Sequence, residues 1–250
     1  MLLRLARLLS TIIMLVLNTL STTLPLNGIS TKNLSDILST VITPAWFTFA
    51  IWSVIYLGII GLTLAILTKK ITLPDRVMIW YIISALANGL RIVARHYQNL
   101  HLAMIIIVAL LVSLIIIDRT LVANSSSIAY FPRVRGSILL YFGRVQIATL
   151  LMTTIYAQYQ LGLLTGYEVP AGMAVIILAW CANLLIICRE KNIITSLVAL
   201  RALWGIINGQ TDPQIILTAQ VVMGLLVGGI LWHEGRSFWK NNIVYNKKIT

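Results

Sequence analysis

Charged residues are scarce in this chain. Of its 250 residues, 10% are Asp, Glu, Lys or Arg, whereas 59% are hydrophobic and the mean hydropathy is +0.92. A soluble domain carries roughly 25% charged residues, which cover its water-facing surface. The shortage of charge excludes a soluble globular protein and predicts an all-α integral membrane protein with little mass outside the bilayer.

Acidic residues are fewer than basic ones, seven against nineteen, so the formal net charge is +12. A basic balance of this size raises the question of nucleic acid binding. Here, however, most of the lysines and arginines are scattered over short connections, as on the cytoplasmic side of a membrane protein. We therefore predict the lipid bilayer as a partner and no nucleic acid.

Catalytic and metal-binding patterns are also missing. The two cysteines, Cys181 and Cys188, lie seven residues apart in one apolar segment, without metal-ligand spacing. No phosphate-binding loop is present, and no Asp, Glu or His lies in the middle of an apolar segment to act as a general base. We expect no catalytic residue, no metal and no required cofactor. His96 and His101, near segment ends, leave axial ligation of a haem open beside simple anchoring at the interface.

Long apolar runs are abundant. Eight of them predict transmembrane helices, because each approaches the roughly 20 residues that a helix needs to cross a bilayer. They cover residues 5–24, 46–67, 77–96, 101–118, 138–160, 171–188, 193–208 and 214–233. The first run also resembles a signal peptide, but its length favours a retained helix. Only the connections 25–45 and 119–137 are long, and the first is predicted to hold a turn and a short amphipathic piece.

Basic residues predict the orientation of these helices. With a cytoplasmic N-terminus, fourteen of them fall on the inner side and only Lys32 on the outer side. The inner set is Arg4, Arg7, Lys69, Lys70, Arg76, Arg119, Arg133, Arg135, Arg189, Lys191, Arg236, Lys240, Lys247 and Lys248. This asymmetry predicts a multi-pass protein of the cell membrane with both termini in the cytoplasm.

The remaining four arginines lie inside apolar segments: Arg91, Arg95, Arg144 and Arg201. An arginine at the centre of a membrane helix costs about 2.5–3.5 kcal/mol on insertion scales, and no acid is placed mid-helix to neutralise one. Two explanations stay open. The arginines face a cavity that holds an anion, as the shared helix face of Asn88, Arg91 and Arg95 indicates, or they bind backbone carbonyls between helices.

Several stretches resemble one membrane protein family. "LPLNG" (24–28) precedes "TPAWFTFAIWSVIYLGIIG" (43–61), and "LLYFGRVQIAT" (139–149) and "LRALWGI" (200–206) follow in order, with Asn88 between them. Together they resemble the longer bacterial branch of the TspO/MBR family, the tryptophan-rich sensory proteins. The resemblance implies a TspO-like five-helix bundle over residues 1–160 and about three appended transmembrane helices over residues 161–250, with a short basic tail.

The resemblance also implies a function. Family members are similar in enclosing a pocket, lidded by the first loop, that binds porphyrins and other large hydrophobic molecules. We expect the chain to bind such a ligand, a porphyrin or haem for example, in a sensory, receptor or transport role. Two alternatives stay open: a membrane enzyme that degrades or modifies a bound porphyrin or lipid, and a membrane subunit of a larger transporter. A homodimer is a further open expectation.

Site residues follow by matching positions to the family pattern. Pro44 and Trp46 would lie at the lid, and Trp52, Tyr56 and Asn88 would face the pocket. The candidate ligand-binding set is Pro44, Trp46, Trp52, Tyr56, Asn88, Arg91, Arg95, Tyr141 and Arg144.

All four arginines inside apolar segments fall where the family tends to have tryptophan. The tryptophan codon UGG and the arginine codon CGG differ by one base. If the source organism reads CGG as tryptophan, a standard translation writes arginine at Arg91, Arg95, Arg144 and Arg201, and the unpaired charges vanish. Genuine divergence towards an anion-binding pocket is the other explanation, and both stay open at this point.

Overall fold

The computed structural model describes residues 1–24, 26–190 and 192–246, with side chains up to Arg236. Helices dominate these residues, as predicted, and no strand is assigned among them. The α-helices are α1 (Leu2–Thr23), α2 (Thr31–Ile37), α3 (Ile51–Leu67), α4 (Asp75–His96), α5 (Leu100–Ala123), α6 (Phe131–Ile155), α7 (Glu168–Glu190), α8 (Ile194–Gly209) and α9 (Pro213–Asn246). A 3-10 turn, η1 (Trp46–Ala50), precedes α3, and a π-helical turn, η3 (Tyr156–Gln160), follows α6.

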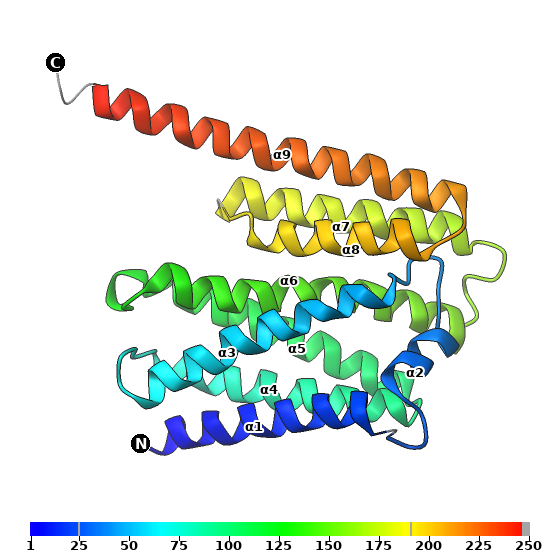
Figure 1. Ribbon diagram of the computed structural model, residues 1–250, viewed down its shortest axis with the longest axis horizontal. Coiled ribbons are helices and arrows are strands. Elements are labelled where there is room, and N and C mark those ends of the chain that lie inside the picture. Colours follow the sequence, from blue (N-terminus) through cyan, green and yellow to red (C-terminus); the bar gives the residue numbers. More distant parts are fainter. Residues whose placement is uncertain (25, 191, 247–250) are drawn as a thin grey trace.

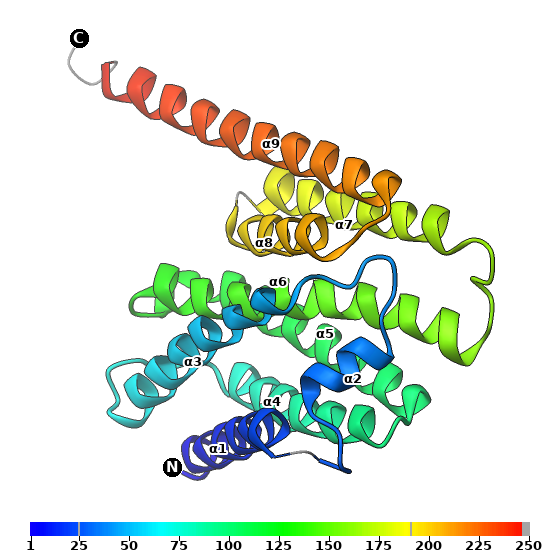
Figure 2. The ribbon, with the colours of Figure 1, turned by 45° about the vertical axis from the view of Figure 1, so that its right-hand side comes forward.

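The long helices stack in layers across the molecule (Figures 1 and 2). Helix α9 forms one outer layer above α7 and α8, α6 lies in the middle beside α3 and α5, and α4 and α1 form the opposite side. Two hydrophobic cores follow this order. One joins α1, α3, α4, α5 and α6 around residues such as Ile55, Tyr81 and Leu110, and the other joins α7, α8 and α9 around Ile176, Leu203 and Ala219. The predicted division at residue 160 stays a prediction.

Seven helical segments among the described residues are long and apolar enough to cross a membrane, with η1 and α3 counted as one segment. Helix α8 has 16 residues and is shorter than the others. The all-α membrane class is therefore confirmed, whereas the predicted count of eight spanning helices rests on α8 and stays a prediction.

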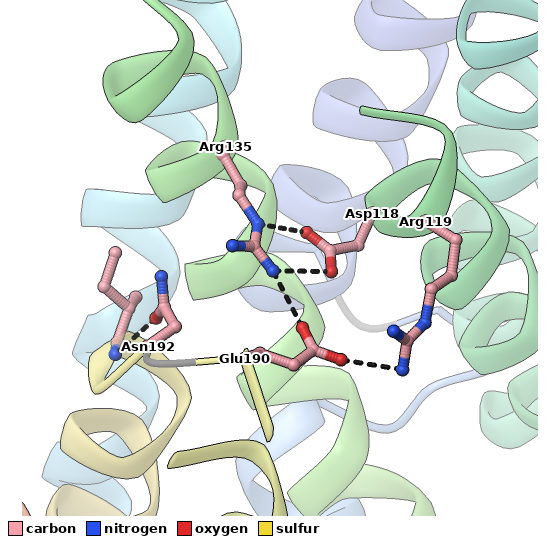
Figure 3. A network of polar contacts seen from close by, with 6 residues as sticks. Asp118, Arg119, Arg135, Glu190 and Asn192 are labelled. Atoms are coloured by element: carbon pink, nitrogen blue, oxygen red, sulfur yellow. Dashed lines mark hydrogen bonds and ion pairs between the residues drawn. The ribbon is translucent and has the colours of Figure 1, made fainter. Parts of the chain in front are cut away.

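The predicted long connection 119–137 is wrong. Helix α5 continues to Ala123 and α6 already begins at Phe131. Two of the three charged residues in the predicted loop, Arg119 and Arg135, are paired instead. Arg135 of α6 donates to both carboxylate oxygens of Asp118 in α5, at 2.7 and 3.0 Å, and to Glu190 of α7 at 2.7 Å (Figure 3). Glu190 also pairs with Arg119 at 2.7 Å. Because these charges neutralise one another, the helices extend past their apolar cores.

Arg7 corrects another expectation. The orientation argument counted it among the residues of the inner surface, but it lies within α1 and is only 1% exposed. Its guanidinium carbon lies 3.8 Å from the centre of the Tyr81 ring in α4. Lys191, Lys247 and Lys248, and the side chain of Lys240, lie outside the described residues, so part of the basic inner set has no structural description.

The first connection folds as predicted, into a turn and a short helix. Asn27 and Gly28 adopt positive φ angles of 55° and 75°, which reverse the chain after α1. Ser30 then caps α2, because its hydroxyl accepts a hydrogen bond from the Asn33 amide at 3.2 Å. The turn is fixed to the end of α4 by Asn27, whose side chain donates to the His96 carbonyl at 3.2 Å.

Candidate functional site

A cavity of about 370 Å³ opens between α1, η1, α3, α4 and α6, next to α2. Pockets for small ligands typically measure about 300–1,000 Å³, so its size suits a bound molecule. The lining residues are Asn18, Thr19, Ser21, Thr22, Thr31, Leu34, Phe49, Trp52, Ser53, Tyr56, Arg91, Ile92, Arg95, His96, Arg144, Ala148, Leu151, Met152 and Ile155.

Aromatic side chains of η1 and α3 form one wall of the cavity. Phe49, Trp52 and Tyr56 recur at helical spacing, which brings them to one face. The rings of Trp52 and Tyr56 are stacked, with centroids 5.3 Å apart. The sequence prediction that Trp52 and Tyr56 face a cavity agrees with this geometry, while their role in binding stays a prediction.

Three arginines line the same cavity. Arg91 and Arg95 come from successive turns of α4, and Arg144 comes from α6. The guanidinium of Arg144 lies over the rings of Phe49 and Trp52, 5.4 and 5.5 Å from their centres. The Nε atoms of Arg95 and Arg144 are buried without a hydrogen-bond partner.

Arg201 has a different environment. It belongs to α8, outside the cavity lining, and its Nη2 donates to the Phe47 carbonyl at 3.0 Å. Of the two explanations for the arginines inside apolar segments, binding to backbone carbonyls between helices therefore applies in part to Arg201. It does not extend to the three cavity arginines, because no hydrogen bond of their guanidinium groups is found among the described residues.

Asn88 and Tyr141 lie behind the cavity rather than on its surface. Asn18 donates to the Asn88 side-chain oxygen at 3.0 Å, and Asn88 donates to the Tyr141 hydroxyl at 2.8 Å. Asn88 and Tyr141 are fully buried, and the Tyr141 ring contacts Trp52 edge-on at 6.1 Å. This chain of hydrogen bonds fixes α1, α4 and α6 relative to one another. The predicted cavity-facing position of Asn88 is thus corrected to a supporting one.

Pro44 and Trp46 line a neighbouring hollow of about 380 Å³ between the first connection and the end of α8. Trp46 is 73% exposed, whereas Pro44 is buried. Thr22, Thr31 and Phe49 line both this hollow and the main cavity. The expected lid position of Pro44 and Trp46 therefore corresponds to a second space that adjoins the first.

The two histidines near the ends of α4 and α5 differ. His96 is 2% exposed and lines the cavity; its Nδ1 contacts the Ile92 carbonyl at 2.8 Å and its Nε2 lies 3.5 Å from the Thr31 hydroxyl. His101 lies outside the cavity lining and contacts the Tyr156 hydroxyl at 2.7 Å. Interfacial anchoring therefore does not describe His96. Within the described residues, no group of three His, Cys, Asp or Glu side chains suits a metal ion.

Comparison with known proteins gives one match. A family model described as TSPO-like protein matches residues 4–232. The chain belongs to the TSPO-like protein family. No curated protein and no solved structure matches the chain.

The TSPO-like match confirms the resemblance found in the sequence and extends it. It continues through α7 and α8 into α9, so these helices lie within the matched region. The structure gives α8 a place next to the site. Its Gly205 carbonyl accepts a hydrogen bond from the Ala45 amide at 2.9 Å, and Gln210, directly after α8, donates to the Thr43 carbonyl at 2.6 Å. The segment held in this way leads directly into η1 and the aromatic wall.

Several lining residues of this TSPO-like cavity were not among the sequence candidates. Asn18 and Thr22 of α1, Phe49 of η1 and Met152 of α6 are examples. Helical spacing offered a signal for some of them, since Phe49 lies three residues before Trp52, and Asn18 four before Thr22. For Met152 the sequence offered none, because it is one of many apolar residues in the segment 138–160.

Proposed function

We propose that this TSPO-like protein binds a tetrapyrrole or another large hydrophobic molecule in the cavity between α1, α3, α4 and α6, in a sensory or transport role. The observation that carries the proposal is the cavity itself, about 370 Å³ with an aromatic wall and an adjoining hollow of about 380 Å³ under the first connection. Family membership supports the same conclusion. We place the protein in the cell membrane with both termini in the cytoplasm, where the ligand reaches the cavity from the bilayer or the outer surface.

The composition of the cavity favours binding over catalysis. No carboxylate is present among its lining residues, and the ionisable side chains there are three arginines, Tyr56 and His96. His96 has one ring nitrogen in contact with a carbonyl of its own helix. A general base with a free approach to a ligand is thus not evident in the lining, and no haem or other cofactor is required by the proposal.

Titration of the purified protein with protoporphyrin IX, followed by quenching of tryptophan fluorescence, tests this function. We expect saturable binding at one site per chain. Ala148→Phe, which places a ring inside the cavity, should weaken binding about tenfold or more because it fills space that the ligand needs. Val54→Phe adds the same ring on the outer, 55% exposed face of α3 and serves as the matched control.

Equal binding by wild type and Ala148→Phe would show that the cavity is not the site. The same samples separate binding from turnover under illumination. Stable, stoichiometric protoporphyrin supports a binding protein, whereas light-dependent loss that Trp52→Phe abolishes would make the protein an enzyme.

A further inference from the structure

Three positively charged side chains line the cavity. Arg91 and Arg95 of α4 and Arg144 of α6 all line it, and Arg144 is only 8% exposed. Each of these side chains belongs to a predicted membrane-spanning helix. In that surrounding an arginine is costly unless a partner or water neutralises it.

No acidic side chain among the described residues pairs with these arginines. The lining residues include no Asp or Glu, and the ion pairs found among the described residues involve Arg119, Arg135 and His233 instead. The Nε atoms of Arg95 and Arg144 are buried without a hydrogen-bond partner. By contrast, Arg135 binds two carboxylates at 2.7 to 3.0 Å. The cavity arginines are therefore free to bind a group that the chain does not contain.

The aromatic wall, over which the Arg144 guanidinium lies, indicates the rest of the ligand. Phe49, Trp52 and Tyr56 present ring surfaces, and the cavity is lined further by apolar residues of α6 such as Leu151, Met152 and Ile155. Aromatic walls suit a flat, apolar body. Guanidinium groups suit carboxylates, which they bind through paired hydrogen bonds.

We infer that the cavity selects its ligand by acidic groups: a flat, apolar molecule of porphyrin size whose carboxylates are bound by Arg91, Arg95 and Arg144. The inference rests on the proposed function and adds the chemical group that is recognised. The aromatic wall holds the ring body, and the arginines of α4 and α6 hold its acidic edge. A neutral molecule of the same shape leaves the three cations unpaired.

The experiment compares protoporphyrin IX with its dimethyl ester, which has the same ring but no negative charge. Both are titrated into protein made with the printed sequence, at neutral pH in neutral detergent. We expect the acid to bind about tenfold or more tightly than the ester, because only the acid can accept charge-assisted hydrogen bonds from the arginines. Arg91→Gln and Arg144→Gln should each reduce the affinity for the acid and leave the affinity for the ester nearly unchanged.

Arg7→Gln is the control, because Arg7 is a buried arginine without a hydrogen-bond partner that lies outside the cavity lining. It should preserve the preference for the acid. Thermal unfolding without ligand checks the variants, and removing an unpaired buried charge should not lower the melting temperature of Arg91→Gln or Arg144→Gln.

The outcomes separate the two proposals. Equal affinity for acid and ester in the wild type, or a preference that survives in both Arg91→Gln and Arg144→Gln, overturns the inference and leaves the binding function standing. Binding of neither porphyrin overturns the proposed function together with the inference. A preference for the acid that both variants lose supports both.

Discussion

Arginine occupies two contrasting environments in this chain. Arg119 and Arg135 lie at helix ends and pair with carboxylates, as the cost of charge near a membrane requires. Arg95 and Arg144 lie in the cavity wall, each with a buried Nε that has no partner, and Arg7 has all three guanidinium nitrogens in that state, packed on Tyr81. Two explanations cover the cavity residues: an acidic ligand that completes the site, or tryptophan in the native protein.

The native protein and its gene decide between these explanations. Reassignment of CGG to tryptophan predicts that Arg91, Arg95, Arg144 and Arg201 are all encoded by CGG, and that peptides from the source organism carry tryptophan there. The paired residues Arg119 and Arg135 provide internal controls, because they must be arginine to bind Asp118 and Glu190 and are expected to use other codons.

Acid recognition by the cavity predicts the opposite result, with peptide masses that give arginine at 91, 95 and 144. A mixture of arginine codons at the four positions contradicts reassignment. A CGG codon at Arg7 would extend the same test to a residue outside the four, since a tryptophan there would pack against the Tyr81 ring and remove three unpartnered nitrogens.

At the scale of elements, α8 is the helix of the α7, α8 and α9 group that positions the site. Helix α8 approaches η1 so closely at Gly205 that a side chain there would collide with Thr48 and Pro44. Arg201 binds the Phe47 carbonyl, and Gln210 binds the Thr43 carbonyl. These contacts fix the start of the aromatic wall and the end of the first connection at the same time.

Removing the Gln210 contact should loosen the site without filling it. Gln210→Ala deletes the hydrogen bond to the Thr43 carbonyl and a longer one, 3.3 Å, to Thr40. We expect affinity for protoporphyrin IX to fall about threefold to tenfold, because a side-chain hydrogen bond contributes roughly 0.5–1.5 kcal/mol. Hydrogen exchange of residues 40–48 should rise in parallel. Asn208→Ala is the control, because Asn208 lies two residues away and its side chain donates only to the Trp204 carbonyl of its own helix. An equal loss of affinity in both variants would show that the Gln210 contacts do not hold the site.

The elements themselves were largely predictable from the sequence, because an apolar run of about 20 residues specifies a membrane helix without knowledge of its neighbours. Helix ends were less so. The predicted loop 119–137 contained Arg119, Arg133 and Arg135, and only the structure shows that Asp118 and Arg135 neutralise each other across α5 and α6. The family resemblance predicted that Trp52 and Tyr56 face a cavity, and for the three arginines a cavity was one of two explanations left open. Asn88 was predicted to face the cavity but lies behind its wall. Helical spacing shows which face of a helix a residue occupies, but not which residues pack against that face.

At the scale of the whole molecule, the two helix groups meet through α6. Gly143 of α6 allows the close approach of α8, since an added Cβ would lie 3.1 Å from the Thr195 Cα. At one end of the bundle, Arg135 of α6 connects Asp118 of α5 with Glu190 of α7 (Figure 3). The cavity depends on this junction for two reasons. Helix α6 supplies Arg144 and Met152 to the cavity wall, and it packs against α8, whose contacts position η1.

Arg135→Met should therefore weaken the junction as a whole. The side chains of Arg135, Asp118 and Glu190 are only 13%, 7% and 14% exposed, so the substitution leaves two carboxylates close together without their shared cation. Breaking a buried ion pair on one side typically costs about 3–5 kcal/mol, and we expect a loss near 3 kcal/mol in the free energy of unfolding. Arg133→Met on the same helix removes an exposed arginine that has no acidic partner among the described residues, and it should change stability by less than about 0.5 kcal/mol.

Denaturant titration in detergent measures the free energy of unfolding of both variants. Equal stability of the two variants would mean that the ion pairs of Arg135 do not hold α5, α6 and α7 together. A triple variant, Asp118→Asn/Glu190→Gln/Arg135→Met, also removes both carboxylate charges. A smaller loss of stability in the triple variant than in Arg135→Met would identify the carboxylates left without Arg135 as the cause of the loss.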